Sequence, residues 1–166
     1  YVPAPVRPAD GRVTVGWVGT SHNFRYLQGI AGALRTFLQR MPQARLIIMS
    51  DRPPALPGLP DGQVGFRYWN PAAELEMIQG LTIGIMPLED TEWTRGKCSL
   101  KMLTYLSCGV PAVVSPVGMN EEVLARGECG VAAVTESDWV DALVWLAGDP
   151  ARCTEMGRSG REIVET

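Results

Sequence analysis

The stretch of sequence that decides the fold covers residues 95–116 and reads RGKCSLKMLTYLSCGVPAVVSP. It predicts a basic loop, a helix from about Ser99 to Cys108, and a Gly-Val-Pro turn that leads into a buried strand. Ser99 is expected to cap the helix, because its hydroxyl can accept hydrogen bonds from the free amides of the first turn. Gly109 ends the helix where a residue without Cβ is least strained, and Pro111 cannot prolong it.

Three basic residues surround the start of this helix: Arg95, Lys97 and Lys101. The free N–H groups of a helix start attract anions, so the added positive charge outlines a phosphate-binding site. The alternative interpretation is that these residues lie on a solvated loop and bind no ligand.

On both sides of this stretch, short apolar strands alternate with amphipathic helices. Strands are predicted at residues 13–18, 46–49, 64–69, 81–86, 112–115 and 131–134. Helices are predicted at residues 24–40, 71–79, 99–108, 120–126, 137–147 and 150–165. This alternation predicts an α/β fold: a Rossmann-like, doubly wound parallel sheet of about six strands with helices on both faces.

Composition limits the class of protein. The chain has 166 residues, of which 46% are hydrophobic and 20% charged, as expected for a globular domain with a real core. A net charge of −3 argues against nucleic-acid binding through bulk charge, and no membrane span or secretory leader is visible. The four cysteines have no CxxC spacing and are expected to be reduced thiols of a cytoplasmic protein. The single histidine, His22, argues against a histidine-based metal site.

The first residues have a different composition from the rest. Residues 1–11 begin YVPAPVRP and are predicted to be a proline-rich linker from a missing amino-terminal domain. Residues 12–166 are then one Rossmann-like domain of a longer protein.

In a doubly wound sheet, ligands bind at the carboxyl ends of the strands. The loops expected at this edge are residues 19–23, 69–70, 87–97 and 116–122. Gly19 and Thr20 can present backbone amides to a phosphate, or they form an ordinary turn. Arg25 lies at a helix start, where a cation is unfavourable unless an anion is bound nearby.

The remaining loops carry aromatic and acidic side chains. Trp69 ends a strand and can stack on a nucleobase, although core packing is the more common fate of such a residue. Glu89, Asp90 and Glu92 can hydrogen-bond sugar hydroxyls or stabilise a developing cation, or they form a solvated acidic loop. Glu122 lies in the first turn of a helix, where a capping role is the alternative.

Taken together, these residues resemble the carboxyl-terminal, nucleotide-sugar-binding domain of GT-B glycosyltransferases of the group 1 family. The most specific part is residues 83–118, IGIMPLEDTEWTRGKCSLKMLTYLSCGVPAVVSPVG. The family commonly has there a strand ending in proline, a variable loop, Gly-Lys or an equivalent, a helix, and Gly-x-Pro-Val-Val-Ala-Ser. GWVG at residues 16–19 and GECG at residues 127–130 add support, and the resemblance covers nearly all of residues 12–165.

The resemblance implies roles for particular residues. Arg95, Lys97 and Glu92 are the residues it suggests for catalysis, the two cations through contact with the donor diphosphate. The donor-binding residues it suggests are Gly19, Thr20, Arg25, Trp69, Lys101, Thr104, Val117, Gly118 and Glu122. Val117 and Gly118 are expected to approach the sugar or phosphate through backbone, and Glu122 matches the acidic residue after the family's Gly-Gly turn.

The sequence departs from the family pattern at two places. Many members carry a pair of glutamates, but the corresponding positions here are Gly96 and Thr104. A threonine can donate one hydrogen bond but lacks the charge of a carboxylate, and Glu92 could replace the first glutamate from a differently shaped loop. Many members also carry an arginine in the first loop, where this chain has Thr20.

The function implied is transfer of a sugar from a nucleotide diphosphate sugar, with retention of configuration. The acceptor, a glycan, lipid or small molecule, would be held by the missing amino-terminal domain, through which alone membrane association is expected. No metal and no cofactor besides the donor is implied, and residues 1–166 alone are expected to be inactive. One alternative is a non-catalytic nucleotide-sugar-binding or regulatory module with the same fold. A nucleotide-sugar epimerase is a weaker alternative.

Overall fold

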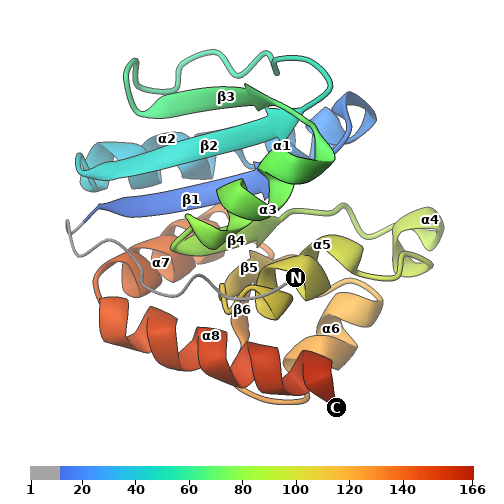
Figure 1. The fold of residues 1–166 in the computed structure, drawn as a ribbon. Helices are drawn as coiled ribbons and strands as arrows, with labels where there is room; N and C mark the ends of the chain where they lie inside the picture. Colours follow the sequence, from blue (N-terminus) through green and yellow to red (C-terminus); the bar gives the residue numbers. More distant parts are fainter. Residues whose placement is uncertain (1–11) are drawn as a thin grey trace.

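The structure is a computed structural model that describes residues 12–166. The linker predicted for residues 1–11 lies outside the described residues. Within residues 12–166, six parallel strands form one sheet in the order β3-β2-β1-β4-β5-β6 (Figure 1). The strands are β1 (Val13–Val18), β2 (Ala44–Ser50), β3 (Val64–Tyr68), β4 (Ile83–Met86), β5 (Ala112–Val114) and β6 (Gly130–Ala132). The predicted Rossmann-like fold is confirmed.

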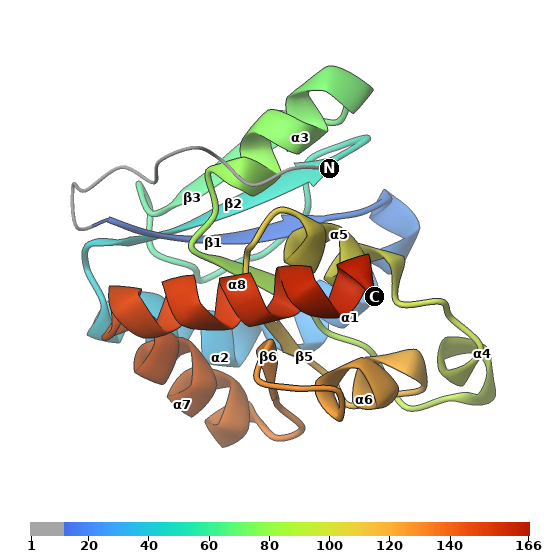
Figure 2. The ribbon, with the colours of Figure 1, turned by 60° about the horizontal axis from the view of Figure 1, so that its bottom comes forward.

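Helices cover both faces of the sheet. They are the 3-10 helix η1 (Ser21–Asn23), α1 (Phe24–Gly29), α2 (Ala31–Arg40), α3 (Pro71–Gln79), α4 (Glu92–Arg95), α5 (Leu100–Ser107), α6 (Met119–Leu124), α7 (Glu136–Ala147) and α8 (Pro150–Glu165). Figures 1 and 2 show α2 and α7 on one face and α3 and α5 on the other. Helix α8 packs against both α5 and α7. None of the helices in residues 12–166 is long and apolar enough to cross a membrane.

The core is divided between the two faces because side chains alternate along each strand. On one face, Trp17 of β1 packs in a cluster with Phe37 of α2 and Trp139 of α7. All three are at most 1% exposed, and burying a side chain of this size contributes about 2–3 kcal/mol. On the other face, Met49, Met102 and Tyr105 belong to a second cluster. Burial on both faces explains why the inner strands β4 and β5 read as continuous apolar runs.

The helical spacing of apolar residues predicts one element over residues 24–40, and this prediction is wrong. The structure divides it into α1 and α2 at Ile30, whose backbone (φ −109°, ψ 13°) is not helical. The residue before the break is Gly29, which has a low helix propensity, and Ile30 packs against the core cluster. Core packing at Ile30 therefore overrides the continuous helical pattern.

A short helix that the sequence pattern does not predict lies between β4 and α5. The composition of residues 87–96 predicts a loop, but α4 forms within them. The Thr91 side chain accepts from the Thr94 amide, and the Thr94 side chain accepts from the Thr91 amide. This reciprocal capping box stabilises a single turn that has too few residues to show helical periodicity.

Helix α8 lies very close to the turn after α5. A Cβ on Gly157 would collide with the backbone carbonyl of Gly109, which cannot move aside as a flexible side chain can. Gly157→Ala is therefore expected to lower the free energy of unfolding by about 2 kcal/mol, measured by urea denaturation. Gly29→Ala is the matched control, because a Cβ there meets nothing within 4 Å and alanine favours the helix. Equal stability of the two variants would contradict this close approach.

Candidate functional site

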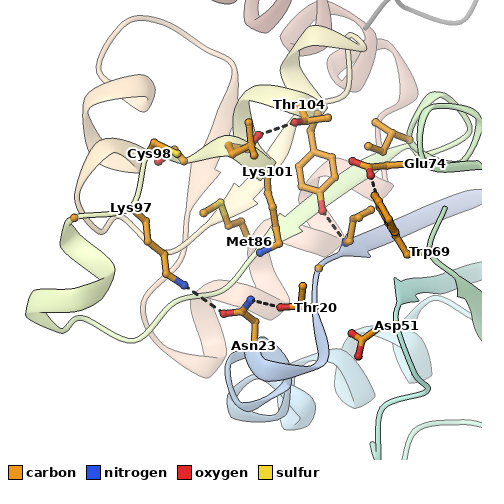
Figure 3. A pocket seen from close by; sticks show the side chains of 17 residues that line it. Thr20, Asn23, Asp51, Trp69, Glu74, Met86, Lys97, Cys98, Lys101 and Thr104 are labelled. Carbon is orange, nitrogen blue, oxygen red and sulfur yellow. Dashed lines mark hydrogen bonds between the residues drawn. The ribbon is translucent and has the colours of Figure 1, made fainter. Parts of the chain in front are cut away.

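A cavity of about 660 Å³ opens at the carboxyl ends of β1 and β4, where the strand order of the sheet reverses. Val18, the last residue of β1, and Met86, the last of β4, both line it. Further lining residues come from the loops after β1, β2, β3 and β4 and from helices α3 and α5 (Figure 3). We call this cavity the switch-point pocket. Its position is the one where doubly wound sheets bind ligands.

The side chain of Tyr105 in α5 forms part of the pocket wall and is itself fully buried. Its ring packs on Gly84 of β4, where a Cβ would collide with it. Its hydroxyl accepts from the Val18 amide (3.2 Å) and donates to the Ile85 carbonyl (3.4 Å), and burial raises the pKa of Tyr105 above its usual value. Tyr105 thus ties β1 to β4, and the glycine in the middle of β4 provides the space.

Two lysines form a basic end of the pocket. The Lys97 amine donates to Asn23 Oδ1 (3.3 Å) and lies 4.9 Å from the centre of the Tyr26 ring. The Lys101 amine lies 5.4 Å from the centre of the Trp17 ring. Burial and the nearby positive charge of Lys97 lower the pKa of Lys101 to about 8. No carboxylate of residues 12–166 pairs with either amine, so this end has positive charge available to an anion.

The loop after β1 faces these lysines. The Gly19 amide donates to the Met49 carbonyl (3.1 Å), so it extends the sheet and is not available to a phosphate. A Cβ on Gly19 would lie 2.8 Å from Lys101 Cε. The absence of a side chain at Gly19 therefore lets Lys101 reach the pocket. Thr20, which is exposed and lines the pocket, accepts from Asn23 Nδ2 (3.1 Å) through its hydroxyl.

Asp51, which follows β2, holds the same loop in place. Its carboxylate accepts from the Ser21 amide (2.6 Å), the Ser21 hydroxyl (2.8 Å) and the Ser50 hydroxyl (3.0 Å). The Ser21 amide makes the largest contribution to a pKa of about 2 for Asp51. Asp51 therefore fixes the loop that carries Thr20 and Asn23.

An aromatic residue and a carboxylate form the other end of the pocket. Trp69 is 50% exposed and lines the cavity, so the core-packing alternative does not hold. Its indole Nε1 donates to Glu74 Oε2 in the first turn of α3. Helix α3 begins at Asn70, whose side chain accepts from the Ala73 amide (2.9 Å) as an N-cap.

The start of α5 differs from the prediction. Ser99 precedes the helix, but its hydroxyl makes no capping bond and instead donates to Asn120 Oδ1 (2.6 Å). Its φ of 50° is the only positive φ at a non-glycine among the described residues. The buried contact with Asn120 therefore overrides the local capping preference of Ser99. The Thr104 hydroxyl donates to the Leu100 carbonyl (2.7 Å), so the hydrogen bond expected from Thr104 to a ligand is already made within the helix.

The third cation of the predicted basic cluster lies elsewhere. The Arg95 guanidinium is paired with Asp90 through two bonds (2.6 and 3.0 Å), and both side chains are exposed. This pairing lowers the pKa of Asp90. Arg95 lines a separate cavity of about 580 Å³. The structure therefore brings together Lys97 and Lys101 without Arg95.

The remaining predicted residues are divided between this second cavity and the surface. Val117, Gly118 and Glu122 line the second cavity with Arg95. Gly118 has a φ of 57°, and a Cβ there would collide with the Arg95 carbonyl, so only glycine fits. Glu92 is exposed at the start of α4. Arg25 is exposed, and its guanidinium donates to the Tyr26 hydroxyl (2.7 Å) outside the switch-point pocket.

Three residues that shape the site do not follow from the sequence pattern: Asp51 and Glu74, which line the pocket, and Asn120, which binds Ser99. Asp51 follows a strand and Glu74 lies in a helical first turn, where carboxylates are common for local reasons. Asn120 is fully buried, and no sequence signal separates it from an ordinary helix-start residue. Within residues 12–166, no group of three or more histidine, cysteine, aspartate or glutamate side chains is placed to hold a metal ion.

Comparison with known proteins identifies the family. The profile of the family described as "Glycosyl transferases group 1" matches residues 12–149. The chain belongs to this family. No curated protein sequence matches the chain significantly. The switch-point pocket and its two lysines are therefore features of a group 1 glycosyltransferase domain.

Solved structures of similar fold include the carboxyl-terminal domain of the group 1 glycosyltransferase LpcC from Francisella tularensis. It has a TM-score of 0.77 and 16% identity, and the match covers 98% of this chain and 93% of that one. Anabaena HepE, solved with UDP and glucose, has a TM-score of 0.69 and 15% identity, with 93% of this chain and 44% of that chain covered. Sucrose-phosphate synthase from Thermosynechococcus elongatus has a TM-score of 0.68 and 17% identity, with 95% and 41% covered. This group 1 domain thus spans less than half of the two longer proteins.

Proposed function

We propose that the switch-point pocket binds the nucleoside diphosphate part of a nucleotide-sugar donor. The observation that carries this proposal is the pair of lysines without carboxylate partners in residues 12–166, Lys97 and Lys101, at the carboxyl ends of the strands. Two amines beside the exposed hydroxyl of Thr20 suit a diphosphate in charge and size. Membership of the group 1 family supports a sugar donor as the source of that diphosphate.

We propose that the chain contributes the donor half of a glycosyltransferase, with the acceptor held by a further domain. When the bond between the anomeric carbon and the diphosphate oxygen breaks, the diphosphate gathers negative charge. Prearranged amines stabilise this charge without a covalent intermediate, and such stabilisation is usually the largest single contribution to catalysis. Retention of configuration and absence of a required metal are part of this proposal, through the family resemblance. Residues 1–166 alone are expected not to turn over substrate, because the acceptor site would be missing.

Titration calorimetry with ADP, GDP and UDP tests the binding proposal. At least one nucleotide is expected to bind residues 1–166 and to raise the melting temperature through mass action. Lys97→Ala is expected to weaken that binding about 10-fold, because a charged hydrogen bond to phosphate is lost. Arg158→Ala, an exposed arginine of α8 paired with Glu162, is the control and should bind as the unmodified chain does. If Lys97→Ala binds the nucleotide as strongly as the unmodified chain does, Lys97 is not part of the binding site.

A non-catalytic nucleotide-sugar-binding module is the second candidate function. It is favoured by Thr104, whose hydroxyl is bonded to Leu100, and by Arg95, whose charge is neutralised by Asp90. Incubation of a protein that includes the acceptor domain with a panel of nucleotide sugars separates the candidates. Release of free nucleoside diphosphate in the presence of acceptor supports the enzyme, whereas binding without turnover supports the module.

A further inference from the structure

The sheet has an open edge at β6. This strand pairs only with β5, and Figure 2 shows it on the near side of the molecule, between α7 and α8. The Cys129 carbonyl and the Ala133 amide bond to β5 (3.4 and 3.0 Å). Because successive residues of a strand direct their backbone groups to opposite sides, the N–H and C=O groups of Gly130 and Ala132 point away from β5. No hydrogen bond within residues 12–166 engages these groups, so they can pair with a further strand.

Two cavities adjoin this edge, and both are lined by Val131 and Trp145. One, of about 570 Å³, lies between β6 and α7, and the other, of about 720 Å³, lies between β6 and the first half of α8. We call the two cavities together the edge groove. Large apolar side chains are exposed beside it: Trp145 is 49% exposed, and Val134, two residues after β6, is 73% exposed. The edge groove therefore offers apolar surface together with unpaired backbone groups.

Contacts within the chain hold the indole of Trp145 in place. The Arg152 guanidinium carbon lies 3.9 Å from the centre of the indole ring, and its Nη1 donates to the Trp145 carbonyl (2.8 Å). The same guanidinium pairs with Asp149 (3.0 Å), which neutralises its charge. The apolar surface of the edge groove is therefore preorganised, and a partner need not order it on binding.

The edge groove is strongly negative. Besides Arg152, all the charged side chains that line it are carboxylates: Glu128, Asp138, Asp141, Asp149 and Glu155. Asp138 caps α7, and Asp149 pairs with Arg152. The other three are exposed, and no basic residue in the described part of the chain pairs with them. A basic partner is complementary to this groove, whereas a second copy of the chain would bring the same carboxylates and be repelled.

We propose that the edge groove binds an extended basic segment of a partner protein, which adds to the sheet as a further strand beside β6. An extended backbone supplies hydrogen-bond partners for Gly130 and Ala132, alternate side chains cover Trp145, and lysine or arginine side chains reach the carboxylates. Carboxylates that only kept the edge from pairing would not be expected beside large exposed apolar side chains. The groove lies at β6, apart from the switch-point pocket at β1 and β4, so this inference does not depend on the proposed function.

The test uses residues 1–166 and a synthetic peptide that alternates lysine and valine. Titration calorimetry at low salt is expected to give a dissociation constant of about 100 μM or lower, and about 0.5 M salt should weaken binding about 10-fold. Residue-resolved hydrogen exchange with saturating peptide locates the contact. The amides of Gly130 and Ala132 are expected to exchange about 10-fold or more slowly than in the free chain, because the added strand engages this edge. A peptide that alternates glutamate and valine should not bind.

Two triple variants test the charge of the groove. The first replaces its three unpaired carboxylates: Glu128→Gln, Asp141→Asn and Glu155→Gln. The control makes the same change of net charge at exposed glutamates outside the groove: Glu76→Gln, Glu92→Gln and Glu121→Gln. The groove variant is expected to bind the lysine-valine peptide about 10-fold more weakly than the unmodified chain, and the control should bind it equally well. Melting temperatures show whether both variants keep the fold.

The exchange measurement uses the unmodified chain, so its result does not depend on how stable the variants are. Slower exchange at Gly130 and Ala132, with weaker binding by the groove variant alone, supports the inference. Absence of peptide binding, equal affinities of the two triple variants, or binding without slower exchange at these amides overturns it. If sedimentation shows a dimer in which the same amides are protected without peptide, a second copy of the chain occupies the groove and the inference is wrong.

Discussion

Replacing Lys101 with methionine is expected to weaken nucleoside diphosphate binding about 100-fold and to raise the free energy of unfolding by about 1 kcal/mol. The two effects have one cause. The amine is largely buried beside Trp17 and Lys97, with no carboxylate of residues 12–166 paired to it. Its charge destabilises the free fold but interacts strongly with a bound anion, because few waters screen it. Methionine keeps the apolar stem and removes the charge.

The same lysine predicts a pH dependence. Burial lowers the pKa of Lys101 from 10.5 to about 8. A lysine with a lowered pKa in the folded state destabilises the fold fully below pH 8, and this effect disappears as the pH rises from about 8 to 10.5. Nucleotide affinity should change in the opposite direction and fall above about pH 8, because Lys101 of the unliganded protein then loses its proton and its positive charge. The rise in stability and the fall in nucleotide affinity with pH should both be absent in Lys101→Met.

Urea denaturation for the stability and calorimetry for the affinity, both between about pH 7 and pH 10.5, check these expectations. Lys101 as a whole is half-buried, so the expected gain in the free energy of unfolding is smaller than the value that the full pKa shift would give. Arg45→Met is the control, since Arg45 is an exposed cation on β2 that does not line the switch-point pocket. A Lys101→Met variant that loses stability and keeps its nucleotide affinity would show that Lys101 stabilises the fold and does not bind the nucleotide.

Replacing Asn120 with alanine is expected to lower the free energy of unfolding by about 3 kcal/mol, a larger loss of stability than we expect for Gly157→Ala. The side chain is fully buried, accepts from the Ser99 hydroxyl (2.6 Å) and donates to the Ser115 carbonyl (2.9 Å). Alanine would leave both buried partners without a hydrogen bond and would open a small cavity. Urea denaturation measures the change, and Glu121→Ala, at the exposed neighbouring position, should stay within about 0.5 kcal/mol of the unmodified chain.

The bond to Asn120 also holds Ser99 in its unusual backbone conformation. Ser99→Ala and Ser99→Gly both remove the hydroxyl, but glycine adopts a φ of 50° without strain. The glycine variant is therefore expected to be more stable than the alanine variant by about 1 kcal/mol. Ser99 lies between Lys97 and Lys101, so loss of Asn120 should also weaken nucleotide binding. An Asn120→Ala variant with unchanged stability would show that Ser99 and Ser115 find other partners.

The order of strands and helices could be predicted from sequence alone, because periodicity and turn residues are local properties. Helices α3 and α8 begin and end as predicted, since proline opens each and an Asn or Asp caps it. The position of the switch-point pocket could also be predicted, because the carboxyl ends of the strands in a doubly wound sheet meet at one edge. The sequence pattern places Lys97, Lys101, Thr20 and Trp69 at that edge, and in the structure they line one pocket.

Tertiary contacts determine the features of the pocket that the sequence does not predict. Ser99 adopts a conformation that its local sequence does not favour, because a buried asparagine 21 positions away binds its hydroxyl. Arg95 lies outside the cluster formed by Lys97 and Lys101 because it is paired with Asp90. Gly19 provides space for the Lys101 side chain and does not offer its amide to a phosphate. The pairing of Trp69 with Glu74 and the lowered pKa of Lys101 depend on which side chains are close in space and how deeply they are buried. Sequence periodicity carries no information about those distances, and the chemistry of the pocket depends on them.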